Sequence, residues 1–202
     1  MVFTALLDTC VLWPSLQRDF LLSLAIEGLY RPAWSSVILA ELEWHETAKL
    51  IKRGEDEVAA RHRAETLIRQ MRSAFEDAEI RGWEGLDGAY GLPDPDDEHV
   101  VAAAVVAGAG AVVTHNVKDF PHERIPAGIQ VLQPAEFAAN TVSVDPVQAR
   151  TAVEAIASRS GRKVPSLTDN DVLDILASRY GLTRAVELIA HVSSGDRDDR
   201  PV

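Results

Sequence analysis

Side chains that could bind a divalent cation occur at three places along this chain, each beside an apolar segment of strand or helix length. Two of the groups follow the apolar runs 2–7 and 111–114, and the third precedes the apolar segment 100–107. In sequence order their members are Asp8, Asp94, Asp96, Asp97, Asn116 and Asp119. Because ligands gather at the carboxyl ends of the strands in an open parallel sheet, we expect the three groups to meet at one edge.

The residue types in these groups predict a hard metal ion rather than zinc. Carboxylates that crowd together resist ionising in common unless a cation neutralises them. The chain has one cysteine and six histidines, and the histidines lack the spacing of a zinc site. Oxygen ligands suit Mg²⁺ or Mn²⁺. Such an ion lowers the pKa of a bound water and stabilises charge at phosphorus, so the residues predict phosphodiester hydrolysis.

The elements that must position these groups alternate between strand and helix over most of the chain. Short apolar runs predict strands at 2–7, 79–83, 111–114 and 129–132. Capping residues and apolar spacing predict helices at about 15–27, 36–53, 55–77 and 100–107. This alternation predicts a parallel sheet in a layered α/β domain.

The pattern changes after Phe137, where helix-start signals follow one another without a strand between them. Asp145 is followed by proline, Thr168 has Asp171 three residues later as in a capping box, and Thr183 precedes a last apolar stretch. We therefore expect an α/β domain over 1–139, a small all-helical extension over 140–194, and a disordered tail over 195–202.

The composition restricts the setting in which such a protein works. No apolar run reaches the roughly 18 residues of a membrane helix, and the first residues lack the pattern of a signal peptide. With Cys10 as its single cysteine the chain cannot form an internal disulfide, which favours the cytoplasm. The net charge of −11 opposes non-specific nucleic-acid binding, so an RNA enzyme of this composition needs a local basic rim or metal ions.

Four segments in order resemble the motifs of PIN domains, and the likeness covers roughly the first two-thirds of the chain. The segments are residues 6–9, 36–42, 94–104 and 112–120. The resemblance implies a PIN-like three-layer fold and a metal-dependent endoribonuclease, a hydrolase that leaves a 3′-hydroxyl and a 5′-phosphate. Many bacterial members are VapC-type toxins of toxin-antitoxin systems, held inactive by a small antitoxin protein, and the resemblance implies such a partner here.

Carried over position by position, the resemblance assigns the catalytic and metal-binding roles. Asp8, Glu41 and Asp97 match the family's metal-binding acids. Asn116 stands where the family has a fourth acid, so it would ligate through its amide oxygen and add no charge. Asp119, three residues later, is the expected compensating ligand. A neutral fourth ligand predicts weaker binding of a second ion, and therefore a one-metal site or a slower enzyme.

Other residues are expected to support the metal or the RNA. Thr9 and Thr114 would hold metal-bound waters or orient the carboxylates. His45 lies four residues after Glu41, on the same helical face, and is a candidate RNA contact. Arg18 and Lys49 begin a run of basic residues that extends to residue 72 and could form a basic rim, although a salt-bridged helix surface explains the run equally well.

Several alternatives remain open from the sequence. Asn116 in an acid's place is also compatible with a degenerate PIN domain that acts as a non-catalytic RNA- or protein-binding module. A haloacid dehalogenase-type phosphatase is rejected, because it needs a second aspartate where this chain has Cys10. Trp13, Trp34 and Trp83 would stack on bases or belong to the core. The apolar extension would dock on the main domain, cover an antitoxin groove or support a homodimer.

Overall fold

The computed structural model describes residues 2–160 and 166–195 and divides the chain into two compact units. The sheet unit comprises Phe3–Pro14 and Arg31–Leu132. The helical unit comprises Ser15–Tyr30 together with Val2 and the described part of Gln133–Val202. Each unit is therefore assembled from segments that are separated in the sequence.

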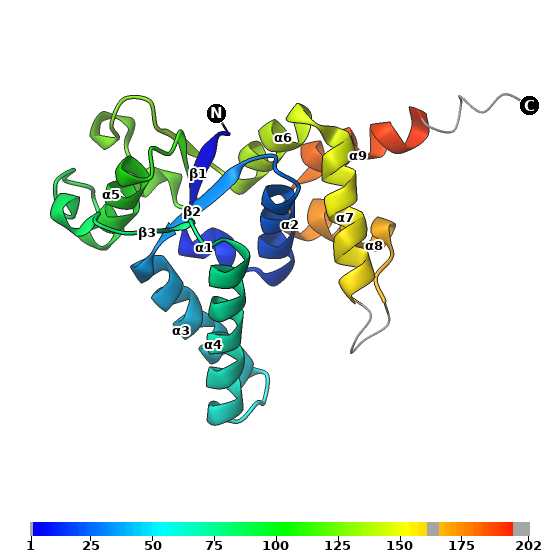
Figure 1. Ribbon diagram of the computed structural model, residues 1–202, viewed down its shortest axis with the longest axis horizontal. Coiled ribbons are helices and arrows are strands. Elements are labelled where there is room, and N and C mark those ends of the chain that lie inside the picture. Colours follow the sequence, from blue (N-terminus) through cyan, green and yellow to red (C-terminus); the bar gives the residue numbers. More distant parts are fainter. Residues whose placement is uncertain (1, 161–165, 196–202) are drawn as a thin grey trace, which may run out of the picture. The chain divides into compact units, whose positions relative to one another are not determined.

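The sheet unit is built on a parallel sheet flanked by helices (Figure 1). Its strands within the described residues are β1 (Thr4–Leu7), β2 (Arg31–Ser35), β3 (Glu79–Ile80), β4 (Ala111–Val113) and β5 (Gln130–Leu132). Its α-helices are α1 (Thr9–Leu12), α3 (Ser36–Lys52), α4 (Glu57–Ala74) and α5 (Glu98–Val106). The strands follow the order β3-β2-β1-β4-β5 and all pair in parallel. The predicted α/β fold with a central parallel sheet is thus confirmed.

The neighbouring strands β1 and β4 consist of continuous apolar sequence, which explains their burial inside the sheet. Ala5, Leu6 and Leu7 in β1 are fully buried, and so are the three residues of β4. Strands covered on both faces carry such uninterrupted apolar runs, whereas half-exposed strands alternate. Helix α5 is likewise apolar along most of its surface and packs on β1, β2 and β4. The carboxyl ends of β1 and β4 therefore lie next to each other, with α5 beginning close by.

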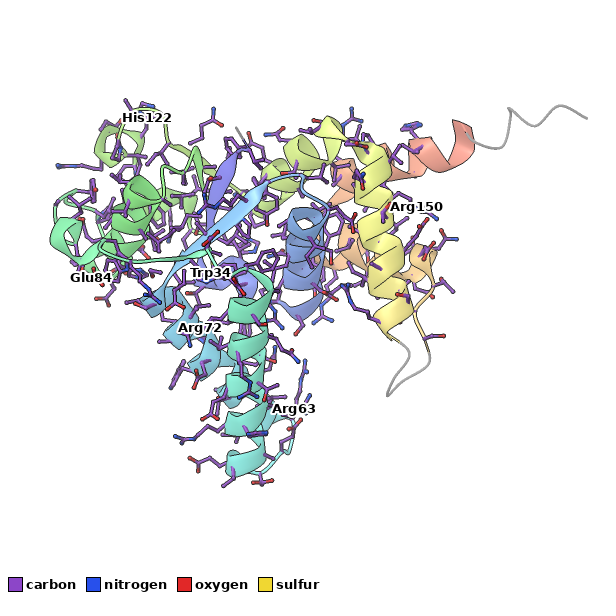
Figure 2. The ribbon with its side chains drawn as sticks, viewed as in Figure 1. Trp34, Arg63, Arg72, Glu84, His122 and Arg150 are labelled. Atoms are coloured by element: carbon purple, nitrogen blue, oxygen red, sulfur yellow. The ribbon has the colours of Figure 1, made fainter. Side chains whose placement is uncertain are left out.

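The strand β2 was not expected from the sequence, because it contains Pro32 and lacks a clear apolar pattern. In the structure Pro32 lies opposite Ala5 of β1, and the pairing with β3 begins only at Trp34. The missing N–H of proline is therefore tolerated at a position that β3 does not flank. Trp34, labelled in Figure 2, is fully buried. Its ring meets that of Phe75 edge to face at 5.9 Å between centroids. Tertiary pairing, not local pattern, makes this segment a strand.

Helices α3 and α4 lie side by side as a helical hairpin of the sheet unit (Figure 1). Arg63 and Arg72 extend from α4 (Figure 2), and Arg72 forms an ion pair with Glu79 at 2.6 Å. Arg63 pairs with Glu55. These charges fit a salt-bridged helix surface. None of the helices among the described residues combines the length and apolar character needed to cross a membrane.

The helical unit packs one early helix against four late ones. They are α2 (Ser15–Ile26), α6 (Pro134–Val144), α7 (Pro146–Ser160), α8 (Asp169–Tyr180) and α9 (Thr183–Gly195). Helix α2 packs against α7, and α6 packs against α9. The predicted capping box of α8 is confirmed. Thr168 Oγ1 accepts a hydrogen bond from the Asp171 amide at 3.2 Å, and the Asp171 carboxylate accepts one from the Thr168 amide at 2.8 Å.

The predicted domain limits stay a prediction. Helix α6 runs without interruption through the expected boundary at residue 139, and the segment containing α2 belongs to the helical unit. The late helices therefore pack with α2, a helix from the early part of the chain. Most of the predicted disordered tail, residues 196–202, lies outside the described residues.

The loop before α5 depends on one buried carboxylate, which gives a stability prediction. Glu98 is 3% exposed and accepts the amide N–H groups of Tyr90 at 2.9 Å and Leu92 at 2.7 Å. Glu98→Ala leaves both donors without their acceptor, so we expect the free energy of unfolding in urea to fall by about 2–4 kcal/mol. The exposed Glu65→Ala on α4 is the control, with an expected change under about 0.5 kcal/mol. A Glu98→Ala protein as stable as this control contradicts the assignment.

Candidate functional site

A pocket of about 720 Å³ opens beside the carboxyl ends of β1 and β4 in the sheet unit. Its lining residues are Asp8, Thr9, Cys10, Trp13, Ala40, Glu41, Trp44, His45, Asp97 and Asn116. The pocket thus brings together acids and an amide that are far apart in the sequence, as the order of the strands requires. Their role as metal ligands stays a prediction.

Asp8 is fixed by its place between β1 and α1. Its amide donates to the carbonyl oxygen of Val113 in β4 at 3.1 Å, so the backbone is held by the sheet. Its side chain is 7% exposed and accepts two bonds on Oδ2, from Thr114 Oγ1 at 2.6 Å and from Cys10 Sγ at 3.0 Å. Hydrogen bonds that fix one carboxylate oxygen also fix the direction of the other.

Thr114 connects the two strand ends at this edge. Besides donating to Asp8, its hydroxyl oxygen accepts the amide N–H of Asn116 at 3.0 Å, and its own amide donates to Leu132 of β5 at 3.0 Å. The fully buried Thr114 therefore links the carboxylate that follows β1 to the backbone of the turn that follows β4.

Cys10 acts as a hydrogen-bond donor rather than a nucleophile. Burial, followed by the charge of Asp8, raises the pKa of the thiol to about 12, so it stays protonated at neutral pH. Its sulfur also accepts the amide N–H of His115 at 3.2 Å. The thiol is thus a neutral group that braces Asp8.

Glu41 reaches the pocket from α3, where Thr9 holds its carboxylate and His99 lies nearby. Thr9 Oγ1 donates to Glu41 Oε2 at 2.5 Å, and His99 Nε2 lies 3.9 Å from Glu41 Oε1. The other ring nitrogen of His99, Nδ1, is 3.2 Å from Ser35 Oγ. Burial lowers the pKa of His99, although Glu41 and Asp8 oppose this shift, so the ring favours its neutral form. This role of His99 was missed in the sequence, where we considered the residue only as a zinc ligand.

The pKa of Asp97 is raised by its burial and by the other acids of the site. It ends the short 3₁₀ turn Pro95–Asp97 that leads into α5. Burial is the first cause of its raised pKa, about 7, and the charges of Asp8, Asp94, Asp119 and Glu41 follow in that order. Asp119 therefore lies within electrostatic reach of Asp97, although it does not line the pocket. The raised pKa means that burial, and after it these negative charges, disfavour the ionised form of Asp97 in the folded protein.

The ligand atoms of the pocket are of the type that a hard divalent ion prefers, but the side chains are not close enough together to surround one. They are carboxylate and amide oxygens, which Mg²⁺ and Mn²⁺ prefer. Within the part of the chain that the structure describes, no three Asp, Glu, His or Cys side chains stand close enough together to hold an ion as they are. The charges of the acids act on one another, but the side chains do not surround a common centre in this structure.

The predicted RNA contacts separate into two places. His45 is exposed in the pocket, with Trp44 beside it on α3. Lys49 Nζ lies 5.8 Å from the ring centre of Trp13 and pairs with Glu46. Arg18 is 8% exposed on α2, in the helical unit. Trp44 was missed in the sequence, although a tryptophan three residues after Glu41 on a helix falls on the same face.

The crowding at Asp97 predicts that the metal-free site lowers stability at alkaline pH. An acid whose pKa rises from 3.8 to about 7 on folding binds its proton more tightly in the folded state, so stability is lost as the pH rises through this window. We expect Asp97→Asn to raise the free energy of unfolding at pH 8 in EDTA by about 1 kcal/mol, a value discounted because the side chain is partly exposed. At pH 4 the difference should vanish.

The control for this measurement is Asp96→Asn, an exposed acid on the same turn, which should change stability little at either pH. Urea unfolding at the two pH values gives the comparison. If wild type proves at least as stable as Asp97→Asn at pH 8, the repulsion inferred at this site does not exist.

Comparison with known proteins agrees with the geometry of the pocket. A family model described as PIN domain matches residues 4–118, which is more than half of the 202 residues and includes every residue that lines the pocket. Neither the curated proteins nor the solved structures that were compared gave a match. PIN domains are in general metal-dependent nucleases. The chain belongs to the PIN-domain family.

Proposed function

We propose that this protein is a Mg²⁺- or Mn²⁺-dependent endoribonuclease whose ion is held by Asp8, Glu41, Asp97 and Asn116. The observation that carries the proposal is that Asp8, Glu41, Asp97 and Asn116, which are far apart in the sequence, line one pocket. The pKa of Asp97, raised first by burial and then by neighbouring acids, fits such a cluster. A cation is the ordinary means by which such a cluster becomes stable in the ionised state. Asp119 supports the site by its charge and is the candidate fifth ligand.

The chain's own residues prepare the site for the ion. Thr114 and Cys10 hold Asp8, and Thr9 holds Glu41, so two carboxylates are oriented before any ligand arrives. Asp97 must lose its proton to ligate, so ion binding near neutral pH should release a proton. When bound, the ion would activate a water and stabilise charge on the scissile phosphate.

Asn116 sets the strength of the proposed site. An amide oxygen ligates without adding charge, so the site carries one negative charge fewer than a site with an acid at this position. The nearby Asp119 offsets part of this loss through its charge. We propose that the ion is bound more weakly than with a fourth acid, and that the reaction leaves a 3′-hydroxyl and a 5′-phosphate, as in the nucleases that the motifs resemble.

The test of the nuclease is a set of carboxylate variants. Asp8→Asn and Asp97→Asn should each lower metal-dependent cleavage of RNA by roughly 100-fold or more, and should weaken Mn²⁺ binding measured by calorimetry. Asp96→Asn, exposed on the same turn as Asp97, should retain both properties. Cleavage that survives in the Asp8 and Asp97 variants refutes the proposed site.

A second candidate function follows from the neutral Asn116: a degenerate PIN domain that acts only as a binding module. The same measurements separate this module from the enzyme. A module of that kind should bind Mn²⁺ weakly or not at all, and should leave RNA intact at every metal concentration. Wild-type protein that binds Mn²⁺ and cleaves RNA only in its presence excludes this candidate.

We propose further that the nuclease acts in the cytoplasm as a VapC-type toxin, inhibited by a small antitoxin. The acidic pocket and the net charge of −11 favour a partner segment with basic residues. The helical unit would offer an additional surface for the antitoxin or for a homodimer.

Inducible expression in a bacterial host tests the toxin role. Expression of the wild-type chain should arrest growth, because unrestrained cleavage of RNA stops protein synthesis. Co-expression of the neighbouring small gene should restore growth, and Asp8→Asn should be harmless by itself. Normal growth with a wild-type protein that cleaves RNA in vitro rejects the toxin role and leaves the nuclease intact.

A further inference from the structure

Two tryptophans on the rim of the pocket are unusually exposed. Trp44 is 67% exposed and Trp13 is 42% exposed, and both line the pocket that contains the carboxylates. The other two tryptophans, Trp34 and Trp83, are buried in the sheet unit. Single exposed apolar residues are common on protein surfaces. Two of the largest side chains at the mouth of one acidic pocket call for a ligand with flat, apolar faces.

The rings come from different elements and meet at His45. Trp13 ends α1, whereas Trp44 and His45 are neighbours on α3. The His45 ring centre lies 4.8 Å from that of Trp44 at an interplanar angle of 76°, and 6.0 Å from that of Trp13 at 55°. Because His45 meets Trp44 nearly edge to face rather than stacked, the indole keeps most of its surface in solvent. The three rings form an aromatic rim that is open to solvent.

The charge of the molecule favours stacking as a source of RNA affinity. The net charge is −11, and the pocket itself contains three carboxylates. Lys49, whose ammonium lies over the Trp13 ring, is also paired with Glu46. Attraction to phosphates is therefore weak at this rim, in contrast to nucleic-acid sites built on basic residues. Stacking of bases on aromatic rings supplies affinity without net positive charge.

We propose that Trp44 and Trp13 are a stacking platform for unpaired bases, a base-binding subsite beside the carboxylates of the pocket. The identity of the ligand as RNA rests on the proposed nuclease function. A base can lie on an indole only when it is not paired and stacked in a duplex. Since the platform and Asp8, Glu41 and Asp97 line the same pocket, a base on Trp44 brings its own backbone toward the carboxylates.

Binding in EDTA tests the platform without cleavage. The probe is a fluorescein-labelled single-stranded RNA of mixed sequence, followed by anisotropy. Trp44→Ala should weaken binding roughly tenfold, whereas Trp44→Phe, which keeps an aromatic face, should retain most of the affinity. Val58→Ala removes another highly exposed apolar side chain, on α4, and should leave binding unchanged. The same RNA annealed to its complement should bind the wild type weakly and show no dependence on Trp44.

An RNA of the same length without bases separates stacking from a structural effect. Wild type should bind this abasic strand about as weakly as Trp44→Ala binds the intact strand. Removal of the bases should then lower the RNA affinity of Trp44→Ala much less than it lowers the affinity of wild type. Moreover, affinity should fall only modestly as salt rises, because few counterions are released. Equal affinity of wild type and Trp44→Ala for the intact strand, or an equal cost of base removal in both, overturns the proposal.

The platform and the nuclease fail in distinguishable ways. If wild type cleaves RNA with Mn²⁺ but Trp44→Ala binds RNA as tightly as wild type does, the platform is wrong and the nuclease stands. If Trp44 controls RNA binding but no metal supports cleavage, the platform stands as a binding site of a non-catalytic domain. If Trp44→Ala instead weakens capture of the co-expressed antitoxin while RNA affinity is unchanged, the rim is a protein interface and the proposal is refuted.

Discussion

The repulsion between carboxylates at one edge of a parallel sheet is the constraint on which this site depends. The acids are brought together because β1 and β4 pair side by side, with α3 and α5 starting at the same edge. The cost is visible in the pKa of Asp97, which burial and four neighbouring acids raise to about 7. A fold stable enough to hold such an arrangement needs a fully apolar interior, and the buried β1 and β4 provide it.

Neutral donors, not cations, organise the carboxylates in the described structure. Thr114 and Cys10 hold Asp8, and Thr9 holds Glu41. Hydroxyl and thiol groups fix the direction of a carboxylate without cancelling its charge, whereas an arginine or lysine would cancel it and lower its affinity for a metal ion. The buried His99, which favours its neutral form, fits the same pattern. Asp8 and Glu41 are therefore oriented while their charge is left uncancelled, as the proposed ion site would require.

An acidic protein that acts on RNA has to replace the affinity that basic residues usually supply. Arg63 and Arg72 of α4 are engaged with acids of the same surface. In the proposed function, a metal ion held by the pocket's carboxylates and aromatic faces such as that of Trp44 would supply affinity instead. Both would be local to the pocket, so the proposed RNA binding does not require the net charge of −11 to be offset over the rest of the surface.

The sequence alone determined the elements whose signals are local. Apolar runs and caps located β1, β4, α3 and α5, and the order of motifs indicated the family and placed Asp8, Glu41 and Asp97 in one site. Only the tertiary structure decided what depends on pairing and packing between distant segments: the strand that contains Pro32, the packing of α2 with the late helices, the contact of His99 with Glu41, and the aromatic rim around Trp44. Periodicity and capping report a residue's own neighbours in the chain, whereas these features arise from pairing and packing between segments far apart in the sequence, which no local pattern encodes.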